Sequence, residues 1–315
     1  MNNQILLLIP EIVINSKIYS SLRDILPNHT LINITTDCVR YKEEFNKHDH
    51  VITWNCRMPH WWFEHHTSKN ILYIENSLLN QRKGIFLDSE GFFSHSHLAK
   101  TPINTTIDDD DICRIQSNIE TILERNLLQH TPVHDDVLLI LQNNDDSNIQ
   151  YQFPLAKNHL NKIKFTLEIM NDFCANQSVD IRPHPRFLNK WNDYMRDDDF
   201  KKLIRSNWNI DVSKDVFSKL NQYKQIVGIN STLLSELLCF GCPISSLGTG
   251  YFTKHGVVND CSKNLSNLLT EFHPDKYQIY KYINEIVSHN MLLYTATANE
   301  ILNNKHFTTW LTNII

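Results

Sequence analysis

Short apolar runs that each end in polar residues recur along this chain, and they restrict its fold more than any other feature. In the first half these runs are QILLLIP (4–10), TLINIT (30–35), HVITW (50–54), NILYIE (70–75) and GIFLDSEGFFS (84–94). Segments with helical spacing lie between some of them, such as SKIYSSLRDIL (16–26) and PHWWFEHHT (59–67). Buried strands that alternate with helices are typical of a parallel α/β sheet.

The same rhythm restarts after a linker-like stretch, LLQHTPVHD at 127–135. The predicted strands of this second half are DVLLILQ (136–142), VDIRPHP (179–185), NWNIDV (207–212), QIVGIN (225–230) and PISSLG (243–248). The helix predicted at 108–126, which has an acidic start, precedes this linker. The helices predicted after the linker are 156–176, 214–222, 231–241 and most of 266–315.

The fold class that follows is α/β, with two Rossmann-like domains facing a cleft. A chain of 315 residues exceeds what one compact core usually holds, which agrees with two domains. We expect an N-terminal domain at 1–130 and a second domain at 131–290. The helical segment 291–315 is a candidate to pack back onto the first domain.

Composition excludes several classes of protein. The net charge is −5 and no long basic run occurs, which argues against a dedicated nucleic-acid binder, because such proteins neutralise phosphates with clustered Lys and Arg. Only seven glycines occur, and neither GxGxxG nor GxxxxGK[ST] is present, so a glycine-rich phosphate loop is excluded.

The cysteines and the start of the chain indicate a reduced, cytoplasmic protein. The seven cysteines are scattered and odd in number, and MNNQILLLIPEIV lacks the basic region of a signal peptide. The CFGC pair, Cys239 and Cys242, has no second pair beside it, so buried small residues explain it better than a metal or redox site. No apolar run is long enough to span a membrane, so any membrane contact is expected to be peripheral.

An acidic pair stands at the end of one predicted strand. The buried run from Val137 to Leu141 leads directly into Gln142, two asparagines, Asp145 and Asp146. Ligands of open α/β sheets bind beyond the carboxyl ends of the strands. We therefore expect the acidic pair to lie at the cleft between the two halves.

A basic cluster follows another predicted strand. The segment DIRPHPRF carries Arg182, His184 and Arg186 around two prolines, which stiffen the loop and disfavour helix. If the chain stays extended, the three side chains share one side and form a cluster that suits a phosphate group. The alternative is that the two arginines pair with surface carboxylates such as Asp193.

Polar residues also open the helix that follows the strand QIVGIN. Asn230, Ser231 and Thr232 precede or begin this helix, and Glu236 lies one turn after Thr232. Hydroxyl groups at a helix start cap free N–H groups, and the same N–H groups bind anions. Two adjacent hydroxyls at a sheet's carboxyl edge favour a phosphate site over capping alone. Glu236 is equally suited to a ribose hydroxyl or to solvent.

Carboxylates follow the strands of the first half as well, at Glu75, Asp88 and Glu90. A pair of carboxylates in opposing domains suits glycosyl transfer or hydrolysis, although a carboxylate at a strand end is usually a cap. Four histidines of this half occur as two close pairs, in HHT and SHSHL, and their spacing does not match a zinc pattern. They are His65, His66, His95 and His97.

Six motifs of the chain occur in an order that matches a known family. They are VITWNCR, YIENSLL, GIFLDSEGFF, LLILQNNDDSNI, RPHPRF and INSTLLSELLCFGCPISSLGTGYFTKHG, which together cover roughly 50–256. This set resembles the bacterial capsular-polysaccharide β-Kdo transferases, retaining enzymes that use CMP-activated Kdo (3-deoxy-manno-octulosonic acid). The resemblance implies a GT-B-like fold that binds the donor in its C-terminal half and the acceptor in its N-terminal half.

The resemblance also implies roles for individual residues. Asp146 takes the place of the family's catalytic carboxylate, which is thought to attack the anomeric carbon, and Glu75 that of an acceptor-side base. His184 is then expected to contact the CMP phosphate, which Ser231 and Thr232 would bind. A buried like charge would raise the pKa of Asp146, so we expect Asp145 to point away. The rest of the expected donor-binding set is Gln142, Arg182, Arg186, Asn230 and Glu236.

The expected function is therefore transfer of Kdo from CMP-Kdo to a surface-polysaccharide or glycolipid acceptor, with retention and without a metal cofactor. Association with the inner membrane or with polysaccharide assembly proteins is part of this expectation. Arg57, Arg82 and Lys83 are candidates to hold the sugar carboxylate. The alternatives are another donor, such as CMP-sialic acid or a nucleotide-diphosphate sugar, a non-catalytic nucleotide-sugar-binding protein, and a hydrolase.

Overall fold

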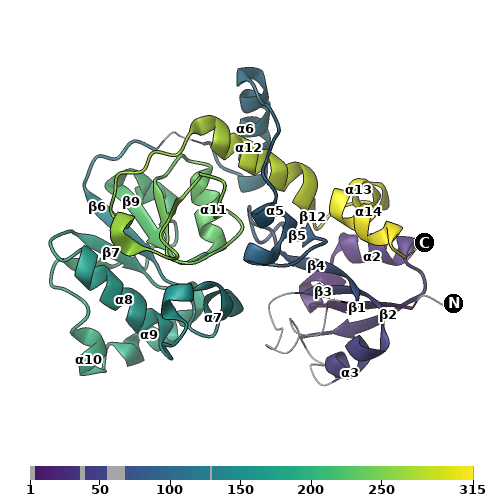
Figure 1. The fold of residues 1–315 in the computed structure, drawn as a ribbon, viewed down its shortest axis with the longest axis horizontal. Coiled ribbons are helices and arrows are strands. Elements are labelled where there is room, and N and C mark those ends of the chain that lie inside the picture. Colours follow the sequence, from purple (N-terminus) through teal and green to yellow (C-terminus); the bar gives the residue numbers. More distant parts are fainter. Residues whose placement is uncertain (1–3, 36–39, 55–67, 128–129, 315) are drawn as a thin grey trace. The chain divides into compact units, whose positions relative to one another are not determined.

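The computed structural model describes residues 4–35, 40–54, 68–127 and 130–314. The chain divides into two compact units (Figure 1). The first takes its residues from 1–104 and 283–315, and the second is formed by 105–282. Both are α/β units, as the sequence predicts, and each is built around a six-stranded sheet.

The first unit is built on a mostly parallel sheet of order β12-β5-β4-β3-β1-β2. Its strands are β1 (Ile5–Ile9), β2 (His29–Asn33), β3 (His50–Trp54), β4 (Asn70–Asn76), β5 (Gly84–Asp88) and β12 (Met291–Leu293). Its α-helices are α1 (Glu11–Ile14), α2 (Lys17–Ile25), α3 (Arg40–Lys47), α5 (His97–Lys100), α13 (Ala298–Asn303) and α14 (Lys305–Thr312). Strands β1 to β4 pair in parallel, whereas β5 runs antiparallel to β4 and β12 antiparallel to β5.

The end of the chain returns to this first sheet. The buried Trp310 donates its indole N–H to the carbonyl of Asn70 at 3.1 Å, and the side chain of Asn70 donates to the carbonyl of Trp310 at 2.9 Å. Figure 1 shows α13 and α14 in yellow; α13 lies beside α2, and α14 contacts α13, β4 and β5. The expected return of the C-terminal segment is therefore observed, but it starts at 283 rather than 291 and includes the strand β12, where we expected only helix.

The second unit has an entirely parallel sheet of order β11-β10-β9-β6-β7-β8. Its strands are β6 (Asp136–Ile140), β7 (Val179–Arg182), β8 (Trp208–Ile210), β9 (Tyr223–Gly228), β10 (Ile244–Ser246) and β11 (Asn259–Asp260). Its α-helices are α6 (Asp109–Leu123), α7 (Ser147–Gln152), α8 (Lys162–Phe173), α9 (Leu188–Tyr194), α10 (Asp198–Lys201), α11 (Thr232–Leu238) and most of α12 (Lys276–Glu285), which continues into the first unit. The sequence predicted a longer helix in place of α8, and an α-helix where Phe217–Gln222 is a 3₁₀ helix.

Helix α6 belongs to the second unit, although the expected boundary near residue 130 placed it in the first. Its first residue, Asp109, accepts a hydrogen bond from the hydroxyl of Tyr277 on α12 at 2.9 Å. Arg125, just after α6, pairs with Asp215 at 3.2 Å. These contacts join α6 to segments far along the chain, which a local reading of the sequence does not reveal.

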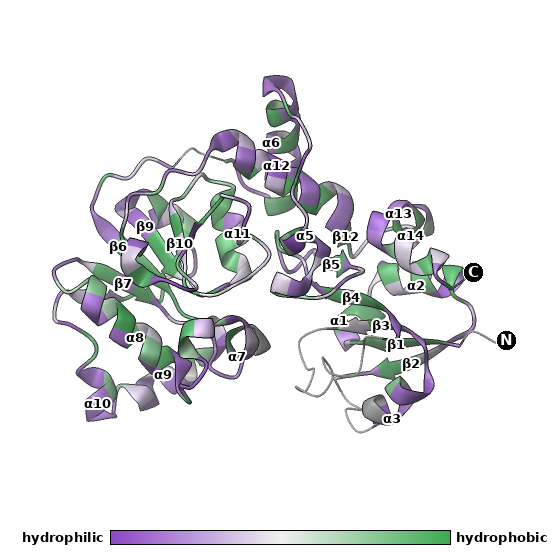
Figure 2. Ribbon diagram, in the orientation of Figure 1, coloured by the Kyte–Doolittle hydropathy of each residue, from purple (hydrophilic) through white to green (hydrophobic). Residues whose placement is uncertain are grey.

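The second sheet contains a topological switch point between β6 and β9. From β6 the chain proceeds outward to β7 and β8, and from β9 it proceeds outward in the other direction to β10 and β11. The inner and carboxyl-end parts of the two central strands are apolar and buried, for example at Leu139 and Val227, because helices cover both faces (Figure 2). Ligands of such sheets bind at the carboxyl ends of the two strands that flank the switch point.

None of the helices in the described ranges is both long and apolar enough to cross a lipid bilayer.

Candidate functional site

Two buried carboxamides join the strand ends at the switch point. Gln142, just after β6, accepts a hydrogen bond from the backbone N–H of Asn230 at 3.0 Å and donates one to the Asn230 side chain at 3.1 Å. Gln142 is 2% exposed and Asn230 is 4% exposed. Both were expected among the donor-binding residues, and the structure shows them bonded to each other beneath the surface of the site.

The loop between β6 and α7 presents the two aspartates differently. Asp145 is exposed, and its carboxylate lies 4.0 Å from the ammonium group of Lys190. Asp146 is half-buried, its N–H donates to the carbonyl of Asn143 at 2.9 Å, and its carbonyl accepts from Gln150 in the first turn of α7 at 3.0 Å. The acid that we expected to be catalytic is thus the more enclosed of the pair.

His184 lies at the carboxyl end of β7 and interacts electrostatically with Asp146. Burial lowers the pKa of His184 below its ordinary value; the carboxylate of Asp146 acts to raise it and the guanidinium of Arg186 to lower it further. Both charged side chains therefore lie near His184. Nδ1 of His184 accepts the backbone N–H of Arg186 at 3.2 Å, so the neutral ring carries its proton on Nε2, where it can donate to a ligand.

The guanidinium of Arg182 is held by a carboxylate and not presented to a phosphate together with His184 and Arg186. The extended chain ends at His184, because a 3₁₀ helix begins at Pro185, so the alternation that would place all three side chains on one side stops there. The guanidinium of Arg182 bonds to the buried carboxylate of Asp211 at 2.6 Å and to Ser213 at 3.2 Å. Arg182 thus pairs with a carboxylate, as the alternative interpretation held, but the partner is a buried acid of the neighbouring strand end rather than Asp193.

The start of α11 is capped by the serine that was expected to bind phosphate. The hydroxyl of Ser231 accepts the N–H of Leu233 at 3.3 Å. Thr232 and Glu236 are both half-buried on this helix. The charge of Glu236 contributes, after burial, to raising the pKa of Cys239, so Glu236 lies near the end of the helix that is away from Ser231.

In the first unit, Glu75 and Asp88 are buried in adjacent strands. Glu75 lies opposite Phe86 near the carboxyl end of β4, whereas Asp88 lies opposite Tyr73 because β5 runs antiparallel. Asp88 therefore lies at the end of β5 that points away from the carboxyl edge of the parallel strands. The expectation that it stands at that edge together with Glu75 was wrong. Its carboxylate accepts backbone N–H groups of Glu90, Gly91, His97 and Leu98 at 2.8–3.4 Å. Burial nevertheless raises its pKa to about 6, and its hydrogen bonds give it a structural role.

Other expected residues of the first unit are placed as follows. Arg57, His65 and His66 lie outside the described residues. Nδ1 of His97 lies 2.6 Å from the carboxylate of Glu90, and Arg82 and Lys83 lie in the turn between β4 and β5. Within the described ranges, no group of three or more His, Cys, Asp or Glu side chains is placed to hold a metal ion.

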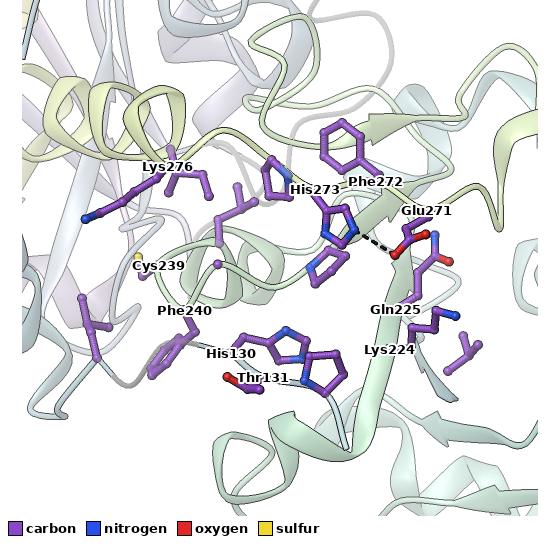
Figure 3. A pocket seen from close by; sticks show the side chains of 18 of the residues that line it. His130, Thr131, Lys224, Gln225, Cys239, Phe240, Glu271, Phe272, His273 and Lys276 are labelled. Atoms are coloured by element: carbon purple, nitrogen blue, oxygen red, sulfur yellow. Dashed lines mark hydrogen bonds and ion pairs between the residues drawn. The ribbon is translucent and has the colours of Figure 1, made fainter. Parts of the chain in front are cut away.

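A cavity of about 650 Å³ lies at the opposite, amino edge of the second sheet (Figure 3). Most polar groups that line it already have partners. His130 bonds to the carbonyls of Leu220 and Tyr223, Gln225 bonds to Ser245 and Leu268, and His273 lies 2.9 Å from Glu271. The CFGC cysteines are buried, Cys239 in the wall of this cavity, and burial raises the pKa of both thiols. The carboxyl edge is therefore the better candidate for the functional site.

Solved structures share this arrangement of elements. Neither a protein-family model nor a curated protein sequence matches the chain. A β-Kdo 2,7-transferase of Thermosulfurimonas dismutans KpsC superposes with a TM-score of 0.58 and 13% identity, over 96% of this chain and 99% of that chain. The β-Kdo 2,4-transferase of KpsC from the same organism gives 0.54 and 12%, over 90% of each chain.

The chain has a GT-B-like fold. This finding agrees with the fold class that the sequence predicts, and at this level of identity the likeness to KpsC concerns the fold.

The sequence did not single out Gln152 and Thr249, which also lie at the carboxyl edge and bond to each other. The only signal for Thr249 is its position in LGTGY after a predicted strand, and Gln152 carries none.

Proposed function

We propose that the chain is a glycosyltransferase that moves Kdo from CMP-Kdo to a surface-polysaccharide or glycolipid acceptor with retention. The observation that carries the proposal is the electrostatic coupling of Asp146, His184 and Arg186 at the switch point of the second sheet. The GT-B-like fold, shared with two β-Kdo transferases, and the order of the sequence motifs support it.

The site contains groups suited to a nucleoside-monophosphate leaving group. The Nε2–H of His184 donates to a phosphate oxygen, and the exposed guanidinium of Arg186 adds positive charge beside it. Ser231 and Thr232 lie at the start of α11, where backbone N–H groups also favour an anion. Gln142, Asn230 and the Arg182–Asp211 pair support this surface from below.

In this proposal Asp146 is the nucleophile. Its carboxylate attacks the anomeric carbon, a carbon–oxygen bond forms, and the bond to the phosphate oxygen breaks as CMP departs with the electron pair. An acceptor hydroxyl then attacks the same carbon, releases the carboxylate and gives its proton to a base, for which we propose Glu75. Two displacements retain the configuration.

The decisive test is donor choice. The purified chain is incubated with glycolipid and surface-polysaccharide acceptors and, in turn, with CMP-Kdo, CMP-sialic acid and a panel of nucleotide-diphosphate sugars, and release of the free nucleotide is measured. In parallel, CMP, UMP, GDP and UDP are compared in thermal-shift assays. We expect CMP to stabilise the protein most and CMP-Kdo to be turned over. A preference for UDP contradicts the Kdo donor, and CMP binding without turnover of any donor indicates a binding protein.

A further inference from the structure

The segment that carries Asp146 is fastened at both of its ends to loops at neighbouring strand ends. At one end Gln142 forms its two hydrogen bonds with Asn230. At the other end Gln152, the last residue of α7, accepts the N–H of Thr249 at 2.7 Å on its carbonyl and the hydroxyl of Thr249 at 2.7 Å on its side chain. The side chain of Asn230 donates to the carbonyl of Thr249 at 2.9 Å, which closes the set.

We call Gln142, Gln152, Asn230 and Thr249 the carboxamide frame. Its three carboxamides are at most 5% exposed, so water cannot readily replace their hydrogen bonds. A Cβ atom on Gly248 would stand 2.7 Å from the carbonyl of Gln152, so a glycine is needed for the close approach of these two loops.

The frame lies beyond the strands rather than within the sheet. Strand β6 ends at Ile140, β9 at Gly228 and β10 at Ser246, and each frame residue at a strand end follows one of these. The side-chain bonds of the frame therefore add little to strand pairing. These side-chain bonds instead fix the position of the loop that carries Asp146 relative to the loop that leads into Ser231.

We propose that the carboxamide frame is a positioning device for the transfer reaction, which holds Asp146 at a fixed place against the donor-binding loop. This inference rests on the proposed function. The residues of the carboxamide frame act by positioning Asp146 and do not contact the substrate. Small displacements of a reacting group reduce turnover strongly while binding is less affected, so loss of the frame lowers kcat more than it raises KM.

The first experiment compares two buried glutamines of the same sheet. Gln142→Leu breaks the frame, whereas Gln225→Leu removes a carboxamide that bonds to Ser245 and Leu268 at the amino edge. We expect both variants to have lowered melting temperatures. Only Gln142→Leu should lose at least about tenfold in kcat, with the donor KM changed by less than about threefold. Equal kcat values for the two variants overturn the inference.

The second experiment tests a single hydroxyl group. Thr249→Val keeps the shape of the side chain and the backbone bond to Gln152, but it removes the hydroxyl's bond to the Gln152 side chain; Thr249→Ser keeps both. We expect kcat to fall in the valine variant and to recover in the serine variant. Loss of kcat in both, or in neither, means that this bond does not position Asp146.

A third measurement needs no substrate, so it separates this inference from the proposed function. Hydrogen–deuterium exchange is followed in 143–152 and 229–233 of the wild-type chain, Gln142→Leu and Gln225→Leu. We expect faster exchange in these two segments for Gln142→Leu alone. If no nucleotide sugar is turned over but this pattern is seen, the frame holds and the proposed reaction fails. Unchanged exchange refutes the frame.

Discussion

The carboxylate of Asp146 raises the pKa of His184 and partly opposes the lowering caused by burial. The two residues lie on segments separated by the whole of α8 in sequence, and the fold brings them together at one edge of the second sheet. Their coupling can be measured directly by titrating the histidine.

Asp146→Asn should lower the pKa of His184, because the nearby negative charge that favours the imidazolium is removed. Arg186→Met should raise it, because a like charge is removed. Both shifts are observable by NMR titration of the His184 ring, and neither depends on a substrate. Shifts of the opposite sign, or no shift in either variant, would show that the three side chains are not neighbours.

Asp146→Ala should reduce turnover of the donor by at least about 10³-fold, because a covalent nucleophile acts as part of a unit that fails without it. Asp145→Ala is the matched control, since its side chain is exposed and pairs only loosely with Lys190. We expect that control to stay within about threefold of wild type. Near-native turnover in Asp146→Ala would mean that another residue is the nucleophile.

Arg182→Met and Arg186→Met should separate stability from binding. The first leaves the buried Asp211 with Lys219 and Ser213 as its remaining partners, which we expect to lower the free energy of unfolding by about 2–3 kcal/mol. The second changes an exposed side chain and should cost less than about 0.5 kcal/mol while weakening CMP binding. Urea unfolding measures the stability of the two variants, and calorimetric titration measures their affinity for CMP. Unchanged CMP affinity in Arg186→Met would exclude Arg186 as a phosphate ligand.

His306 should make the first unit sensitive to acid. This buried ring bonds to Ser89 and Asn290, and burial lowers its pKa to about 3 from an ordinary value of 6.5. The unfolded chain therefore takes up a proton on His306 near pH 6.5, whereas the folded chain does so only near pH 3, so stability falls as pH drops through this window. At pH 5 the loss is about 2 kcal/mol relative to neutral pH.

The matched variant for this prediction is His306→Gln, which keeps polar atoms but does not titrate. Asp88 acts in the opposite direction, because burial raises its pKa to about 6 and its stabilising effect is lost as pH rises through the range 3.8 to 6. Only the difference between wild type and His306→Gln, followed by chemical unfolding from pH 7 to pH 5, isolates the histidine. An unchanged difference across this range contradicts the prediction.

Local patterns were sufficient for much of the fold. The run HVITW coincides with β3 at both ends, and QILLLIP contains β1, because strands buried on both faces are mostly apolar. The strand β12 was missed because its three residues, Met291–Leu293, are defined by pairing with β5, more than 200 positions earlier, and not by any local pattern.

The sequence predicted which strand ends carry polar residues, but not how those residues pair. The rule that ligands bind at carboxyl strand ends directed attention to the segments of Asp146 and His184, and in the structure these two residues interact electrostatically. That they form the functional site stays a prediction. Whether a polar side chain faces a ligand or another part of the chain depends on long-range partners. Gln142 bonds to Asn230 and Arg182 bonds to Asp211, although tens of residues separate the partners in sequence. No local feature of the sequence specifies either pairing.

The return of β12 to β5 has a consequence for synthesis on the ribosome. When residues 1–104 have emerged, the edge strand β5 of their sheet still lacks its partner β12. This pairing can form only after 105–282 have been translated. A nascent chain in this condition offers open backbone groups to any other strand nearby. The second unit, which is continuous in sequence, is able to complete its own sheet first, so the N-terminal part of this protein is the last to be finished.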